Sequence, residues 1–339
     1  MSYISIDNLN QIHIELSNYC NAACPMCPRF DWDGNLQEEY VNSHNITLEL
    51  IKSRLEPALL SRLTSFWSNG TYGDGAVNPD CVEIFQYIRE HSPTCNLKLL
   101  TNGGPRNKKF WHDLGSIPRM TVLFSIDGLE DTNHLYRKNV QWSKLMQNVQ
   151  SFIDAGGKAA WKMIVFRHNE HQIEEARQLA NAMGFAGFSI QYSERWAQRN
   201  YVHTDQVHVV EKWDAGGYFL EKPLSQPKSG MVDPSIKKFN YDDNIACKAC
   251  SKNVKEIYIR ANGQVQPCCM VGEIQRHEVG GLVDSPEDIN LHIHSLKNIL
   301  EGSFFKRIAD GIAGGPTRLQ NCFYVCGHQE RYNSTADGK

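Results

Sequence analysis

The sequence predicts an α/β fold in which parallel strands alternate with crossover helices. Apolar runs of strand length alternate with stretches of helical apolar spacing from residue 11 to residue 192. The turns between them are short and carry Gly or Asn, which are common turn residues. Alternation of this kind builds a parallel sheet, because each strand needs a crossover before the next can run in the same direction. No apolar run in the 339 residues is long enough to cross a bilayer.

Six strands are expected. The first alternates apolar and polar residues, which is the period of a half-buried strand. The others are short apolar runs bounded by turn residues. In chain order the expected strands are 11–16, 64–68, 96–100, 120–126, 159–166 and 188–192.

Five helices are expected between these strands, from their helical apolar spacing. Asn45 or Thr47 is a suitable N-cap for the first helix, and Gly184 stops the last. In chain order the expected helices are 47–63, 78–90, 107–115, 141–155 and 171–183.

Three cysteines follow the first expected strand in a CxxxCxxC spacing: Cys20, Cys24 and Cys27. Thiolates are the usual protein ligands of iron–sulfur clusters, and closely spaced cysteines allow one loop to wrap one cluster. Three thiolates leave one iron of a four-iron cluster open, and an open coordination site is where a metal centre does chemistry. A structural zinc site is the alternative, but it needs a fourth ligand.

This cysteine spacing resembles that of the radical S-adenosylmethionine (SAM) superfamily, with Met26 where an aromatic residue is usual. The resemblance implies a [4Fe–4S] cluster whose open iron binds SAM. It also implies reductive cleavage of SAM to a 5′-deoxyadenosyl radical, which abstracts hydrogen from a substrate. The implied fold is a partial (β/α)6 TIM-like barrel, with its chemistry at the carboxyl ends of the strands.

Loops after the second and third strands supply the first expected contacts with SAM. Gly73 and Asp74 resemble the family's Gly-Glu motif, which contacts the SAM amino group, although Asp replaces Glu and Ala76 stands where Pro is common. Asn102 lies in a turn that resembles one lining the SAM pocket. A plain glycine turn is the alternative for the first loop.

The end of the fourth strand supplies further expected contacts. Ser125 and Asp127 project to the same side of the strand end and match the family's ribose motif. The alternative is a strand-end turn in which Asp127 caps the following segment. Arg137 is a candidate for clamping the SAM carboxylate, and a surface arginine is the alternative. No residue is assigned as a catalytic acid or base.

A second cysteine group lies in the tail. A hairpin is expected at 256–260 and 263–267, turning at an Asn-Gly pair, and helical stretches at 286–300 and 304–312. The tail resembles a SPASM domain in its shortened "twitch" form, which holds one auxiliary [4Fe–4S] cluster. Five cysteines compete for the four ligand positions: Cys247, Cys250, Cys268, Cys322 and Cys326.

The resemblance favours Cys250, Cys268, Cys322 and Cys326 as the auxiliary ligands, with Cys247 as the substitute. Cys269 is left out, because adjacent side chains on a strand point in opposite directions. A zinc ribbon is the alternative for this group. The two cysteines outside both groups, Cys81 and Cys95, are expected to be ordinary buried residues.

The expected division of the chain is a radical SAM barrel over 1–221, a linker over 222–246 and a small α+β auxiliary-cluster domain over 247–339. Prolines and glycines break any regular period in the linker.

The composition indicates where the protein acts. A net charge of −3 gives no bulk attraction to nucleic acid or to an anionic membrane. No basic segment followed by an apolar run begins the chain, so no secretory signal is expected. Eleven cysteines, mostly in two groups, indicate metal ligation in a reducing cytoplasm rather than a disulfide frame.

The leading hypothesis is a radical SAM oxidoreductase or maturase acting on a peptide-like or small polar substrate. The auxiliary cluster would accept an electron from the substrate or anchor it, and an external donor such as a flavodoxin or ferredoxin would supply electrons. The prefix 1–10 is too short to hold a domain that binds a peptide leader. The alternatives are a non-catalytic iron–sulfur electron carrier or sensor, and a zinc-binding scaffold.

Overall fold

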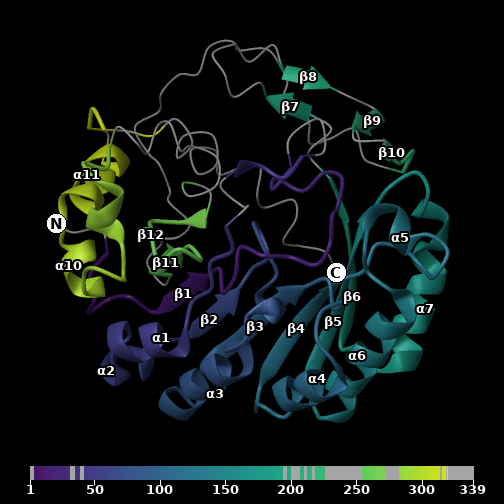
Figure 1. The fold of residues 1–339 in the computed structure, drawn as a ribbon, viewed down its shortest axis with the longest axis horizontal. Coiled ribbons are helices and arrows are strands. Elements are labelled where there is room, and N and C mark those ends of the chain that lie inside the picture. The colour runs from purple at the N-terminus through teal and green to yellow at the C-terminus, as the bar shows by residue number, and fades with distance from the viewer. Residues whose placement is uncertain are drawn as a thin grey trace.

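The computed structural model describes residues 4–30, 35–38, 42–193, 197–199, 207–209, 212–215, 218–225, 254–269, 271, 282–313, 315–317 and 319. An eight-stranded sheet lies at its centre, and Figure 1 shows its strands along an arc with helices on the convex side. The strand order is β12-β11-β1-β2-β3-β4-β5-β6. These strands are β1 (Gln11–Ile14), β2 (Ser65–Ser68), β3 (Asn96–Thr101), β4 (Met120–Ser125), β5 (Lys158–Val165), β6 (Gly187–Tyr192), β11 (Glu256–Ile259) and β12 (Val265–Gln266).

Strands β1 to β6 confirm the expected parallel α/β fold. Each pairs in parallel with the next strand along the chain. Side chains alternate between two faces, as β4 illustrates: Phe124 is fully buried and its ring contacts those of Trp111 in α4 and Phe152 in α6. Its neighbour Ser125 is half-buried on the concave, inner face. In β4 the outer face therefore belongs to the apolar core, and the inner face carries the half-buried residues Thr121, Leu123 and Ser125.

The main helices cover the outer face: α1 (Leu48–Arg54), α2 (Pro57–Leu60), α3 (Cys81–His91), α4 (Lys108–Gly115), α6 (Trp142–Asp154) and α7 (Ile173–Met183). Shorter helices are α5 (Asn133–Tyr136) and the 3₁₀ segments η2 (Gly75–Val77) and η3 (Glu170–Gln172). Thr47 caps α1 by accepting a hydrogen bond from the Leu50 amide, and Gly184 ends α7 with φ of 87°. Both were expected from the sequence.

The prediction of one continuous helix over 47–63 is wrong. The segment forms α1 and α2, which are separated at Leu55 and Glu56. Pro57 is the cause, because its ring disfavours a helical conformation at the preceding residue and has no amide hydrogen to donate. Pro57 instead begins α2, where a missing amide hydrogen costs nothing.

The tail hairpin forms as expected, with β11 antiparallel to β12 and Gly263 in the turn at φ of 86°. Its position was not expected: β11 pairs in parallel with β1, so the hairpin extends the barrel sheet. The helical stretch expected at 286–300 is interrupted, with η5 (Pro286–Ile289) and α10 (Leu296–Leu300) on either side of Asn290, which bridges to Gln264. Helix α11 (Ser303–Ile312) follows.

Two small hairpins stand apart from the main sheet. Strand β7 (Ala197–Arg199) pairs with β8 (Val207–Val209), and β9 (Lys212–Ala215) pairs with β10 (Tyr218–Glu221), both antiparallel. Figure 1 shows them above the open side of the arc. Residues 226–246 of the expected linker lie outside the described residues, so the division into domains stays a prediction.

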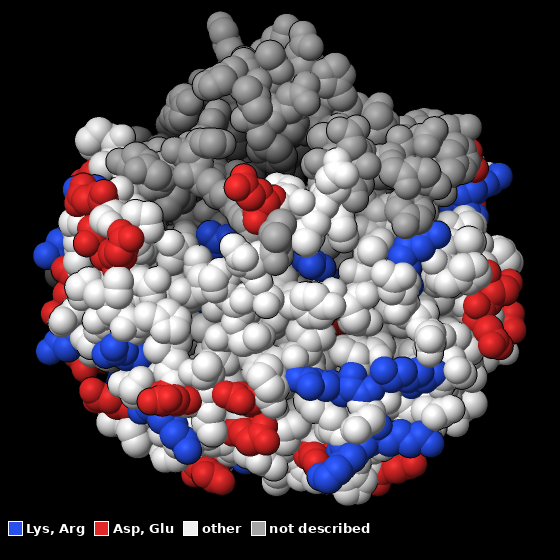
Figure 2. All heavy atoms as spheres, in the orientation of Figure 1, with Lys and Arg blue, Asp and Glu red and all other residues white. Residues whose placement is uncertain are grey.

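Charged side chains of both signs are interspersed over the face shown in Figure 2, in keeping with the net charge of −3. Among the residues that the structure describes, no helix combines the length and the apolar character that crossing a membrane requires.

Candidate functional site

The three-cysteine loop begins at the carboxyl end of β1. An antiparallel bridge between Ser17 and Asn45 holds its entry, and the Cys27 amide donates to the Cys24 carbonyl at 3.0 Å. Cys24 is buried, whereas Cys20 and Cys27 are half-buried, and all three are free thiols. The structure therefore places the three predicted ligands on one compact loop at the rim of the sheet.

Hydrogen-bond donors are directed at the first thiol. The Ala22 amide lies 3.4 Å from Cys20 Sγ, and Asn102 Nδ2 lies 3.5 Å from it. Burial raises the pKa of the Cys20 thiol, and burial raises the pKa of Cys24 to about 11. Buried thiols of this kind hold their protons until a metal displaces them, and donors near sulfur stabilise the resulting thiolate.

The predicted Gly73–Asp74 loop contacts the cysteine loop directly. The Asp74 amide donates to the Tyr19 carbonyl at 2.8 Å, and a Cβ added at Gly73 would lie 2.0 Å from the Ser17 carbonyl oxygen. No side chain fits at such a separation, so the close approach of the two loops requires glycine at this position.

The carboxylate of Asp74 connects η2 with the end of β3. Its Oδ2 accepts from Thr101 Oγ1 at 2.9 Å and from the Asn102 amide and side-chain nitrogens at 2.9 and 2.7 Å. Its Oδ1 accepts from the Ala76 amide at 3.0 Å. Burial raises the pKa of the Asp74 carboxyl, and the hydrogen bonds from these donors partly offset that rise. The structure thus joins two predicted SAM-pocket residues, and Asp74 holds the Asn102 amide against Cys20. We call Asp74, Asn102 and Cys20 the amide branch.

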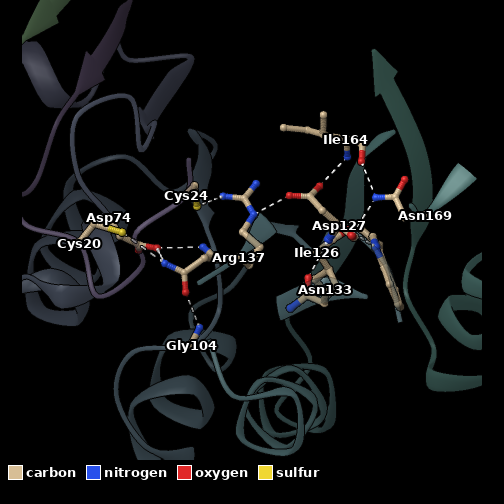
Figure 3. Close-up of polar contacts among 12 residues, drawn as sticks. Cys20, Cys24, Asp74, Gly104, Ile126, Asp127, Asn133, Arg137, Ile164 and Asn169 are labelled. Carbon is tan, nitrogen blue, oxygen red and sulfur yellow. Dashed lines mark hydrogen bonds and ion pairs between the residues drawn. The ribbon is translucent and has the colours of Figure 1, made fainter. Parts of the chain in front are cut away.

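A second chain of contacts reaches the second thiol (Figure 3). Asp127 Oδ2 lies 2.6 Å from Arg137 Nε, and Arg137 Nη1 lies 3.6 Å from Cys24 Sγ. The Ile164 amide donates to Asp127 Oδ1 at 2.5 Å. We call Asp127, Arg137 and Cys24 the guanidinium branch.

The electrostatics of this branch follow from its burial. The Asp127 side chain is fully buried and that of Arg137 is 15% exposed. Burial alone would lower the pKa of Arg137, but the Asp127 carboxylate and the Cys24 sulfur raise it, so the guanidinium stays charged. Burial raises the pKa of the Asp127 carboxyl, and Arg137 opposes that rise. Since both oxygens of Asp127 already accept hydrogen bonds, its contacts favour a role in holding Arg137, and its ribose contact stays a prediction.

Two other predicted contacts also stay predictions. Ser125 lies on the inner face at the end of β4, and its hydroxyl has no hydrogen-bond partner in the described part of the chain. Arg137 uses Nε and Nη1, while Nη2 makes no hydrogen bond to a described residue and so remains open to a carboxylate. The alternative prediction of a surface arginine at position 137 is wrong, because the Arg137 side chain is largely buried.

The auxiliary ligand set is not brought together by the described residues. Cys268 is half-buried just after β12, as is its neighbour Cys269. The other four candidates, Cys247, Cys250, Cys322 and Cys326, lie outside the described residues. The auxiliary cluster therefore stays a prediction. Cys81 and Cys95 are fully buried, as expected.

Sequence reasoning missed the asparagines that shape the Asp127 turn. Asn133 Oδ1 accepts from the Asp127 amide at 2.9 Å, and Asn169 Nδ2 donates to the Asp127 and Ile164 carbonyls at 2.9 and 3.0 Å. Both are almost fully buried. Isolated asparagines near strand ends are common in turns, so the sequence holds no signal that separates these two.

It also missed polar residues on the inner face of the strands. His13 of β1 is fully buried, and its ring stacks on that of Trp67 in β2 with 3.7 Å between centroids. Burial lowers the pKa of His13 to about 3, so the ring is neutral. Lys162 of β5 is half-buried on the same face. Strand alternation was the signal that marked both positions.

The donor set fits an iron–sulfur cluster. Within the described ranges, no group of three or more His, Cys, Asp or Glu side chains is close enough to share one metal ion. Ligands of a four-iron cluster bind different irons, so they need not converge on one point. Three thiols on one loop, two of them facing nitrogen donors, match that requirement.

Comparisons with known proteins find solved structures that share the fold of this chain. No protein-family model matches the sequence, and no curated protein matches it. Among solved structures, Streptococcus suis SuiB aligns with a TM-score of 0.59 at 14% identity, over 91% of this chain and 68% of that chain. SuiB bound to its precursor peptide SuiA aligns with a TM-score of 0.57 at 14% identity, over 92% and 67%.

A further match is anSMEcpe with bound AdoMet and the Cp18Cys peptide, with a TM-score of 0.54 at 14% identity over 93% of this chain and 87% of that chain. SuiB has also been solved with bound S-adenosylmethionine. At this identity the likeness shows a shared fold, which is the parallel α/β partial barrel.

Proposed function

We propose that this protein is a radical SAM enzyme in which Cys20, Cys24 and Cys27 hold a [4Fe–4S] cluster that binds SAM. The observation that carries the proposal is the convergence of two buried carboxylate branches on two of these thiols. The amide branch directs Asn102 at Cys20, and the guanidinium branch directs Arg137 at Cys24. A chain that used these cysteines only to pack its core would not need buried charge beside them.

The chemistry supplied by the bound cluster and SAM is reductive cleavage to a 5′-deoxyadenosyl radical that abstracts a hydrogen atom from the substrate. The residues of this chain bind and orient. The Gly73–Asp74 loop would face the SAM amino group, and Ser125 the ribose. Arg137 would present Nη2 to the SAM carboxylate while Asp127 fixes its direction through Nε.

The auxiliary cluster forms a second part of the proposal. Cys250, Cys268, Cys322 and Cys326 would hold a second [4Fe–4S] cluster in a SPASM/twitch-like domain, with Cys247 as the substitute ligand. That cluster would accept an electron or anchor the substrate, which would make the protein an oxidoreductase or maturase. A flavodoxin or ferredoxin would supply electrons, and a cytoplasmic location follows from the need for a reducing compartment.

A peptide-like substrate is favoured over a small polar one. SuiB has been solved with a precursor peptide and anSMEcpe with the Cp18Cys peptide, and both share the fold of this chain. A non-catalytic iron–sulfur carrier is the second candidate. It would bind clusters without cleaving SAM.

The test uses anaerobically reconstituted protein. We expect about eight irons per chain, and 5′-deoxyadenosine on addition of SAM and dithionite. Cys24→Ala should lose about half the iron and all cleavage. Cys81→Ala is the matched control, because Cys81 is also buried but lies in α3. Clusters without cleavage would favour the carrier, and cleavage that survives in Cys24→Ala would refute the assignment of the loop.

A further inference from the structure

Lys162 lies on the inner face of β5. Its neighbours Trp161 and Met163 are fully buried on the outer face, where the Trp161 ring contacts those of Trp142 and Phe185. Because strand residues alternate between faces, Lys162 points to the concave side of the sheet. The residue is half-buried there, so its side chain is partly withdrawn from water.

The register of the sheet sets Lys162 beside the proposed SAM site. Ser125 of β4 and Ser189 of β6 are its paired neighbours on either side. Two residues further along β5, the Ile164 amide donates to Asp127. Lys162 therefore lies one inner-face position before Ile164, which contacts the guanidinium branch, and it has a serine residue on the strand at either side.

The Lys162 amine has no direct hydrogen-bond or ion-pair partner among the residues that the structure describes, although its backbone is paired within the sheet. Asp127 is the acidic group that acts on it, but Asp127 already accepts from Arg137 and from the Ile164 amide. Burial lowers the pKa of the Lys162 amine, and the positive charge of Arg137 adds to that effect.

A half-buried cation without a partner is unfavourable, and a bound anion would offset its cost. Of the described charged groups that act on Lys162, Asp127 and Arg137 carry opposite charges, so the Lys162 amine adds one positive charge to this set. One charge flanked by two hydroxyl donors matches a carboxylate, which carries one negative charge and accepts several hydrogen bonds.

We propose that Lys162 is a specificity-determining residue that binds a carboxylate of the substrate, with Ser125 and Ser189 beside it. The proposal rests on the proposed function, because it takes the inner face next to the SAM site as the place of the substrate. It narrows the substrate to a molecule or peptide that carries a carboxylate near the abstracted hydrogen.

The test is lysine footprinting of the reconstituted protein with saturating SAM. The rate of Lys162 acetylation is followed by mass spectrometry of its peptide, with Lys158, which is exposed at the start of β5, as the internal control. The probe is N-acetylglutamate amide, and its uncharged isostere N-acetylglutamine amide is the matched ligand control. At ten times the probe's dissociation constant, we expect about tenfold slower labelling of Lys162 and no change at Lys158.

Three results would overturn the proposal. Equal protection by the glutamine probe would show that Lys162 does not distinguish a carboxylate from an amide. No protection by either probe would show that no carboxylate binds at Lys162. Protection by SAM alone, with no further effect of the glutamate probe, would assign the carboxylate to SAM. Formation of 5′-deoxyadenosine, measured on the same sample, reports separately on the proposed function, so protection without cleavage would leave the carboxylate site standing.

Discussion

The two branches of the site both link a buried carboxylate to a cysteine, but they use different kinds of hydrogen-bond donor. Each begins at a buried carboxylate near the end of a strand and ends at a cysteine of the same loop. Asp74 is surrounded by four neutral donors and directs an amide at Cys20. Asp127 has one charged partner and directs a guanidinium at Cys24.

This difference indicates that the two branches have different roles. Neutral donors in η2 and at the end of β3 fix the position of the Asp74 loop, so the role of the amide branch is mainly structural. The guanidinium branch keeps a formal positive charge beside Cys24, where both the anionic cluster and the SAM carboxylate would lie. We therefore expect loss of the charged branch to cost more than loss of a neutral donor.

The largest effect should come from Arg137→Met. This change removes the partner of a fully buried carboxylate, and breaking a buried pair costs about 3–5 kcal/mol. Urea denaturation of the cluster-free protein under anaerobic conditions measures the loss. Arg167→Met, which removes a more exposed pair with Glu170, is the control and should cost less than about 1 kcal/mol. Equal losses in the two variants would show that the Asp127–Arg137 pair is not buried.

Asp74→Asn should have an intermediate effect. The new amide nitrogen must face donors on one side, since both Asp74 oxygens accept hydrogen bonds, and an unmet buried donor costs about 1–3 kcal/mol. The same urea measurement applies, with Asp113→Asn on the surface of α4 as control. A loss as large as that of Arg137→Met would contradict the distinction between the branches.

The smallest effect concerns His13, which lies on the inner face outside both branches. Its folded pKa of about 3 is below the ordinary value of 6.5, so protons bind the unfolded chain more readily. The stability from His13 is therefore present above pH 6.5 and is lost as the pH falls toward 3. Between pH 7 and pH 5.5 the loss attributable to His13 should be about 1 kcal/mol.

Urea denaturation at the two pH values, compared between wild type and His13→Phe, isolates this contribution. If the pH dependence of stability is the same in His13→Phe as in the wild type, His13 is not its cause, and other titrating groups, such as those of the two branches, would have to account for it.

Local pattern was sufficient for much of the fold. The alternation of strands and helices, the Thr47 cap and the Gly184 stop depend on neighbouring residues, and each forms as predicted. A helix break at Pro57 could have been predicted, because proline disfavours a helix interior, but the helical apolar spacing continues on both sides and indicated one helix. The pairing of β11 with β1 joins residues more than two hundred positions apart, and no local period encodes such a contact.

The site divides in the same way. The cysteine spacing identified the loop, and the order of the strands located Asp74, Asn102, Asp127 and Arg137. The sequence did not predict that Asp127 holds Arg137, or that the Lys162 amine has no direct partner among the described residues. The first fact depends on how the chain after β4 folds through α5 to place Arg137 against Asp127, and the second depends on the register of β4 and β5.

In the proposed function, the three-cysteine loop holds a cluster to which SAM binds. Electron paramagnetic resonance of the dithionite-reduced protein, recorded before and after SAM is added, tests it most directly. We predict that SAM changes the spectrum of one cluster, that Cys24→Ala abolishes this change, and that Cys268→Ala leaves it intact. A SAM-dependent change that persists in Cys24→Ala, or no change in the wild type, would show that this loop does not hold the cluster that binds SAM.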